Sequence, residues 1–146
     1  MLVFSEYQTD TIDLALDFYG YEDCPKNYEF GPSVRDNFVL HFITKGKGVF
    51  HFNKKEIHLE AGDLFLLPKN KVTYYKADEE EPWSYYWIGI SGTKVSDFMR
   101  FSTLHAKGFL KKTEVDTERI GQFMEQLIHK AEAAKLSPHY QLHLLS

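Results

Sequence analysis

The sequence predicts a mainly β domain, built as a sandwich or closed barrel of short strands and followed by C-terminal helices. Phe, Tyr and Trp make up 16% of the 146 residues, and aromatic residues favour strands. Between residues 36 and 91, short apolar or alternating runs are separated by turns that contain glycine, proline or polar residues. After Gly92 the apolar residues instead recur at helical spacing.

Six strands are expected in residues 36–91, because each apolar or alternating run ends at a turn signal. Gly46 and Gly48 supply the first turn, and Pro68 ends a later apolar run. An acidic loop at 78–82 separates the last two strands. The expected strands are 38–44, 49–53, 56–60, 64–67, 73–77 and 83–91. Strands at this close spacing are typical of a sandwich or a barrel.

Two to three helices are expected after the strands. Val95 and Met99 share one helical face, and Gly108 is a suitable C-terminal stop for that helix. Asp116 or Thr117 can cap a second helix. The second helix carries an apolar stripe formed by Ile120, Phe123, Met124, Leu127, Ile128 and Ala131. Such a stripe either covers the barrel or contacts a second subunit, and amphipathicity alone does not distinguish the two.

A third helix is expected to begin at Ser137, with Pro138 at its first helical position. The chain ends at Ser146 inside this helix, and no stop signal follows. We therefore expect the 146 residues to be a domain of a longer protein.

Composition and charge argue against several classes of protein. The net charge of -4 and the pI near 6.0 are unlike the basic surface of a nucleic-acid-binding module. Cys24 is the single cysteine, so an internal disulfide is excluded. The sequence has neither an apolar run of about 20 residues nor a signal peptide at its start. A soluble cytoplasmic protein is expected, with no membrane partner.

Residues 62–73 resemble the second of two motifs that define the cupin barrels. Gly62 and Pro68 match the motif, and Asn70 stands at a glycine position, where it tolerates left-handed geometry. Thr73 stands where the motif has its metal-binding histidine. This motif therefore lacks the histidine that a metal-dependent cupin would use as a ligand.

The first cupin motif lacks its ligands as well. With Gly46 as the anchor, Ser33, Arg35 and Val39 stand at the His, His and Glu positions. A Zn, Fe or Mn site needs three or four N, O or S donors, so we expect no metal and no other cofactor. Three further histidines alternate with apolar residues and are expected to be ordinary strand histidines: His41, His51 and His58.

Several segments, in this order and spacing, resemble the N-terminal effector-binding domain of AraC-family transcription regulators. They are residues 20–22, 31–42, 45–48, 61–68 and 82–90. The resemblance covers roughly residues 18–105. It implies a cupin-like (double-stranded β-helix or jelly-roll) barrel that binds a small effector, often a sugar. It further implies a homodimer formed by the C-terminal helices, and DNA contact only through a helix-turn-helix domain absent from this chain.

The same resemblance implies a division of the chain and a set of ligand-binding residues. An N-terminal arm and first strands occupy residues 1–35, the core of the barrel 36–91, and a helical dimerisation segment 92–146. The implied effector-binding residues are Arg35, Tyr75, Tyr85 and Trp87, and the implied dimerisation residues are Ile120, Phe123, Met124, Leu127 and Ile128.

Alternation along the strand places Trp83, Tyr85 and Trp87 on one face, and the resemblance favours that face as the inner one. Tyr85 stands where the family's arabinose-sensing member has a histidine, so the sugar is left open. Two purely structural alternatives stay open. In the first, these rings only fill the barrel; in the second, Arg35 forms a salt bridge with the acidic loop at 78–82.

Three functions stay open on the sequence. The first, which we favour, is a non-catalytic sugar-sensing and dimerisation domain of an AraC-type regulator. The second is a metal-free cupin enzyme, such as a sugar isomerase or epimerase. That function needs an acid and a base, and the sequence shows no paired carboxylates. The third is a structural or storage barrel without a ligand.

Overall fold

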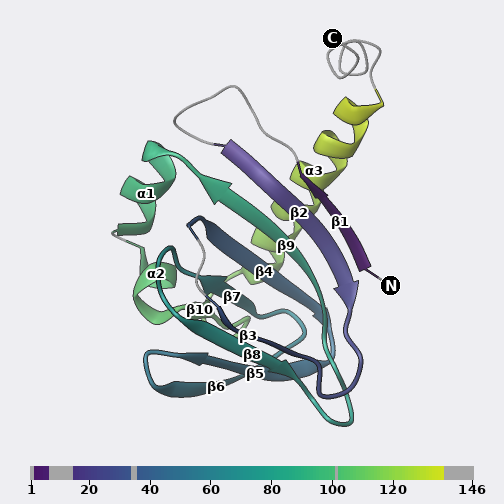
Figure 1. Ribbon diagram of the computed structural model, residues 1–146, viewed down its shortest axis with the longest axis vertical. Helices are drawn as coiled ribbons and strands as arrows, with labels where there is room; N and C mark the ends of the chain where they lie inside the picture. Colours follow the sequence, from purple (N-terminus) through teal and green to yellow (C-terminus); the bar gives the residue numbers. More distant parts are fainter. Residues whose placement is uncertain (1, 7–14, 34–35, 101, 137–146) are drawn as a thin grey trace.

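A computed structural model describes residues 2–6, 15–33, 36–100 and 102–136 of the chain. Two antiparallel sheets face each other, and helices cover the outer side of the larger sheet (Figure 1). The predicted fold class, mainly β with C-terminal helices, is confirmed. None of the helices in this described part is long and apolar enough to span a bilayer.

The larger sheet has six strands in the order β1-β2-β9-β4-β7-β10, and the smaller has four in the order β3-β8-β5-β6. The strands are β1 (Leu2–Glu6), β2 (Ala15–Asp23), β3 (Glu29–Ser33), β4 (Phe38–Lys45), β5 (Lys47–Phe52), β6 (Lys55–Glu60), β7 (Leu64–Leu67), β8 (Thr73–Ala77), β9 (Ser84–Ser91) and β10 (Phe109–Leu110). The helices are α1 (Thr93–Arg100), α2 (Thr103–Lys107) and α3 (Thr117–Lys135).

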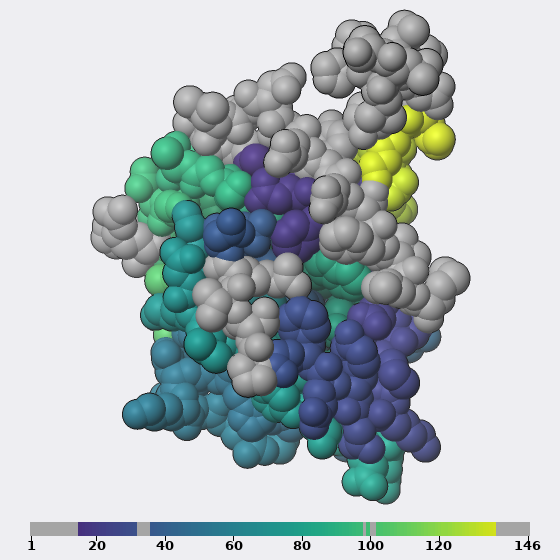
Figure 2. Space-filling view, in the orientation of Figure 1, coloured from purple at the N-terminus to yellow at the C-terminus, as the bar shows by residue number. Residues whose placement is uncertain are grey.

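Strand alternation divides the interior into two apolar cores. On β9, Tyr85 and Trp87 face the smaller sheet and join the core between the sheets. Ile88, one residue further on, joins a second core between the larger sheet and the helices. The Trp87 face is thus the inner one, as the resemblance implied. The C-terminal part of α3 emerges at the opposite end of the molecule from the smaller sheet (Figures 1 and 2).

The first predicted helix is two short helices in the structure. Ser102 interrupts it, because its hydroxyl accepts a hydrogen bond from the backbone N–H of His105 and so caps α2. Gly108 ends α2 in the left-handed conformation, as predicted. Asp116 caps α3. The predicted helix from Ser137 lies outside the described residues.

A buried carboxylate fixes the start of α3 against the barrel. Asp63 is 3% exposed, and it accepts hydrogen bonds from the backbone N–H groups of Glu60 and Lys112, both at 2.9 Å. The hydroxyl of Thr117, the first residue of α3, donates to the carbonyl of Gly62 in the same turn. The turn before β7 therefore holds both the strand and the helix.

Candidate ligand-binding pocket

Cross-strand pairing places the inward-facing residues of the larger sheet in rows. Because paired residues lie side by side, each row brings three or four strands together. The rows run Phe18–Gly89–Val39–Leu67, Gly20–Trp87–His41–Phe65 and Glu22–Tyr85–Ile43. Glycine at 20 and 89 leaves space beside the larger side chains. The ring of Phe18 occupies the space beside Gly89, so a Cβ at this position would clash with it.

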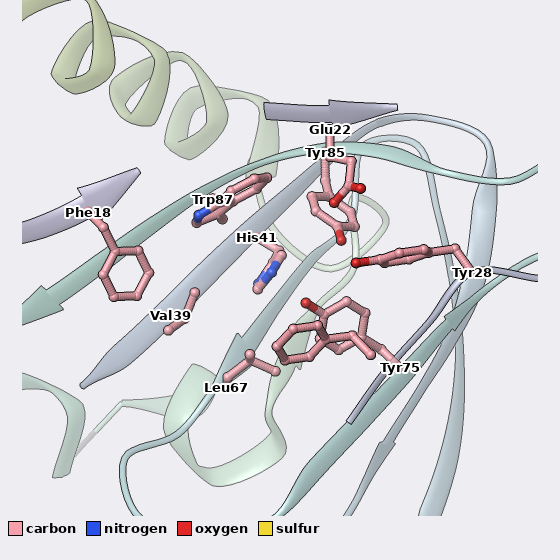
Figure 3. A pocket seen from close by; sticks show the side chains of 10 residues that line it. Phe18, Glu22, Tyr28, Val39, His41, Leu67, Tyr75, Tyr85 and Trp87 are labelled. Carbon is pink, nitrogen blue, oxygen red and sulfur yellow. The ribbon is translucent and has the colours of Figure 1, made fainter. Parts of the chain in front are cut away.

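A cavity of about 210 Å³ opens between these rows and the smaller sheet (Figure 3). The smaller sheet contributes Phe30 and Tyr75, which pair across β3 and β8 and stack at 5.2 Å between ring centroids. Most of the wall is aromatic, with few polar groups, which is the usual composition of a small-molecule site. The residues that line the cavity are Phe18, Glu22, Tyr28, Phe30, Val39, His41, Leu67, Tyr75, Tyr85 and Trp87.

His41 lies on β4, between β9 and β7, and its ring lines the pocket on the side of the larger sheet. Its ring stacks on Phe65 at 4.3 Å between centroids and meets the edges of Tyr75 and Tyr85 at 5.3 and 4.9 Å. The residue is only 2% exposed. It therefore differs from His51 and His58, which lie outside this pocket and fit the description of ordinary strand histidines.

The polar groups of the pocket converge on one side. Figure 3 shows the hydroxyls of Tyr28, Tyr75 and Tyr85 and the carboxylate of Glu22 turned toward the same space. Burial raises the pKa of Glu22. Burial, followed by the negative charge of Glu22, raises the pKa of Tyr28. Burial, followed by the neighbouring Tyr75, raises the pKa of Tyr85, so this phenol stays protonated and can donate a hydrogen bond.

The structure brings together three of the four residues for which the resemblance implied effector binding. Tyr75, Tyr85 and Trp87 all line this same pocket, whereas Arg35 lies outside the described residues. Effector binding by all four stays a prediction. Sequence reasoning did not single out Glu22 or Tyr28 as site residues. A strand assignment for residues 15–23 would have found Glu22, because Phe18, Gly20 and Glu22 then share one face.

The pocket does not fit the metal that many cupin barrels hold. Val39 forms part of the wall, and Thr73 is buried at the start of β8. Within the described ranges, no group of three or more His, Cys, Asp or Glu side chains could hold a metal ion. Glu22 and His41 are two donors, fewer than a metal site needs.

The apolar stripe of α3 is divided between the barrel and the surface. Met124 is fully buried, and Ile128 and Ala131 are nearly so, all within the core beneath the larger sheet. Ile120 and Leu127 are partly buried against that core. In contrast, Phe123 is 59% exposed. The stripe therefore covers the barrel with one edge and leaves the other edge open.

The sequence-family model of the AraC-like ligand binding domain matches residues 15–145 of this chain. The chain belongs to this family. Three curated relatives regulate operons. They are the Msm operon regulatory protein of Streptococcus mutans (47% identical over 70% of this chain), the raffinose operon regulator RafR of Pediococcus pentosaceus (41% over 66%) and the lactose operon transcription activator of Staphylococcus xylosus (30% over 90%).

The matched stretch spans less than half the length of these relatives: 37%, 36% and 48%, respectively. Among solved structures, the fold is similar to that of YhaK from Escherichia coli, with a TM-score of 0.53 and 14% sequence identity. That match covers 63% of this chain and 45% of YhaK.

Proposed function

We propose that this chain is the effector-binding module of a sugar-responsive transcription regulator and that the pocket is its sensing site. The observation that carries the proposal is an aromatic-lined cavity with converging hydroxyls and a carboxylate, inside an AraC-like ligand binding domain. A sugar ring has apolar faces that stack on Trp87 or Tyr85, and its hydroxyls can pair with the polar side of the cavity.

A galactosyl unit is the sugar moiety that best fits the relatives and the size of the cavity. Two relatives are named for raffinose and lactose operons, and both of these sugars carry galactose at an end. The cavity has a volume of about 210 Å³, whereas typical ligand pockets have volumes of about 300–1,000 Å³. We therefore propose that one sugar ring enters the pocket and that the rest of an oligosaccharide stays outside.

The proposed role is binding without turnover. Glu22 and His41 both line the pocket and are residue types that serve in acid–base catalysis, so the isomerase or epimerase alternative is tested directly. Incubation of galactose or lactose with the protein should leave the NMR spectrum of the sugar unchanged. DNA contact is assigned to the part of the full-length regulator that lies outside the matched stretch, and the protein is expected to act in the cytoplasm.

We also propose that a second copy of the chain covers the open edge of α3. Ile120, Phe123 and Leu127 follow one another at the spacing of a helical seam, and Phe123 is the exposed member. A homodimer would bury this ring and place the two copies of α3 together. An effector that changes the pocket could then shift the balance between dimer arrangements.

Calorimetric titration with galactose, melibiose, raffinose and lactose tests the sensing role. Tyr74 and Tyr75 are neighbours on β8, but only Tyr75 lines the pocket, so they provide a matched pair. Tyr75→Phe should weaken binding of the best sugar about fivefold to tenfold, because one hydrogen bond is worth about 1 kcal/mol. Tyr74→Phe should leave it unchanged. No binding of any of the four sugars, or equal losses in both variants, would contradict the proposal.

A further inference from the structure

Glu22 introduces a carboxylate into a pocket whose other described lining residues are aromatic or aliphatic. It is the single carboxylate among the described residues that line the cavity, and none of those lining residues is lysine or arginine. Its position is fixed, because β2 lies inside the larger sheet and Glu22 pairs with Leu2 of β1 on one side and Tyr85 of β9 on the other.

The surroundings of this carboxylate stabilise its charge poorly. Burial raises the pKa of Glu22, and the positive charge of the N-terminus opposes that rise with a smaller effect. Among the described residues, no side-chain or backbone donor contributes a hydrogen bond to this shift. A charged group that loses water needs donors in exchange. The tyrosine hydroxyls and the Glu22 carboxylate point toward the same space (Figure 3), and a ligand that carries hydroxyl groups can supply the donors.

We propose that Glu22 is the specificity-determining residue of the pocket and that it selects uncharged sugars over sugar phosphates and sugar acids. This inference rests on the proposed function, because it concerns the ligand of the same site. A sugar hydroxyl donates to the carboxylate in a charge-assisted hydrogen bond, which is about twice as strong as a neutral one. A phosphate dianion has no such donor, and its charge repels the carboxylate.

The inference also assigns a place to this sensor in sugar metabolism. The effector would be a sugar that has not yet been phosphorylated. The reactions that consume it would then be phosphoryl transfer to the sugar and hydrolysis of its glycosidic bond. A sensor of a phosphorylated product would need a cation where Glu22 lies, because arginine or lysine is the usual partner of a phosphate.

The experiment titrates the 146-residue chain with two matched pairs of probes: galactose against galactose 6-phosphate, and lactose against lactose 6-phosphate. The uncharged member of at least one pair should bind at least tenfold more tightly than its phosphate. Glu22→Gln keeps the shape of the side chain and removes its charge. It should weaken binding of the uncharged sugar about tenfold and narrow the discrimination against the phosphate. Glu56→Gln makes the same charge change on the exposed face of β6 and should alter neither quantity.

The outcomes separate the two proposals. Binding of a phosphorylated sugar as tight as, or tighter than, that of its uncharged partner would overturn the role of Glu22 and leave the sugar-sensing function intact. Unchanged discrimination in Glu22→Gln would also overturn it. If no member of either pair binds, the sensing function fails together with this inference. A circular dichroism melt of each variant checks that a loss of binding does not reflect unfolding.

Discussion

Asp63 offers the sharpest test of how the barrel holds α3. Its carboxylate is 3% exposed and accepts two backbone hydrogen bonds of 2.9 Å, from Glu60 on the strand side and from Lys112 on the helix side. Asp63→Ala leaves both N–H groups without this acceptor. An unpaired buried donor costs about 1–3 kcal/mol. For two such donors the expected loss in free energy of unfolding is therefore about 2–6 kcal/mol, a large fraction of the roughly 5–15 kcal/mol of a typical domain.

Urea denaturation followed by circular dichroism measures this loss. Asp63→Asn should fall between the wild type and Asp63→Ala, because the amide keeps one oxygen as an acceptor but turns a donor toward the second N–H. Asp36→Ala, a change of the same size at an exposed position, should shift the free energy of unfolding by less than about 0.5 kcal/mol. An Asp63→Ala protein as stable as Asp36→Ala would show that these two hydrogen bonds do not stabilise the fold.

Three further outcomes are expected. Phe123→Ser should convert a dimer to a monomer in analytical ultracentrifugation, whereas Val72→Ser, at an apolar side chain that is 63% exposed, should not; a dimer that survives Phe123→Ser would exclude this surface. Gly89→Ala should displace the ring of Phe18, and it should weaken sugar binding at least fivefold by calorimetry; unchanged affinity would show that this end of the cavity stays empty. Burial raises the pKa of Cys24 to about 12, and the thiolate is the reactive form. The folded protein at pH 8 should therefore react with Ellman's reagent at least a hundredfold more slowly than the urea-unfolded protein, and similar rates would contradict that burial.

The strands that the sequence predicted best are those with one unambiguous signal. β7 and β8 have the predicted bounds, because an apolar run stopped by Pro68 and a short alternating run leave little choice. Sequence reasoning set no bounds for β2. Both of its faces are used: Tyr19 is buried against α3, where its hydroxyl donates to Glu132, and Glu22 faces the pocket. A polar residue on an inner face obscures the alternation on which strand prediction depends.

The same cause limited prediction of the site. The prediction of Tyr75 and Trp87 rests on the family resemblance. Strand alternation adds only that Trp87 shares a face with Tyr85, because aromatic residues on an inner face fit both a core and a pocket. Glu22 was missed because its placement depends on β2 and on the pairing of β2 with β9, a contact between residues more than 60 positions apart. The break between α1 and α2 depends on a local signal, the cap at Ser102, which competes with the continuous helical spacing of the apolar residues around it.

We expect a sugar ring to enter the pocket and contact Trp87. The chain has two tryptophans: Trp87 lines the cavity, whereas Trp83 is fully buried outside it. Tryptophan emission during a titration with the sugar that binds best in calorimetry therefore reports on this contact directly. The wild-type spectrum should shift as sugar is added, and the spectrum of Trp87→Phe, in which Trp83 alone emits, should stay constant. An equal shift in Trp87→Phe, or no shift in the wild type at saturating sugar, would show that the bound sugar does not contact Trp87.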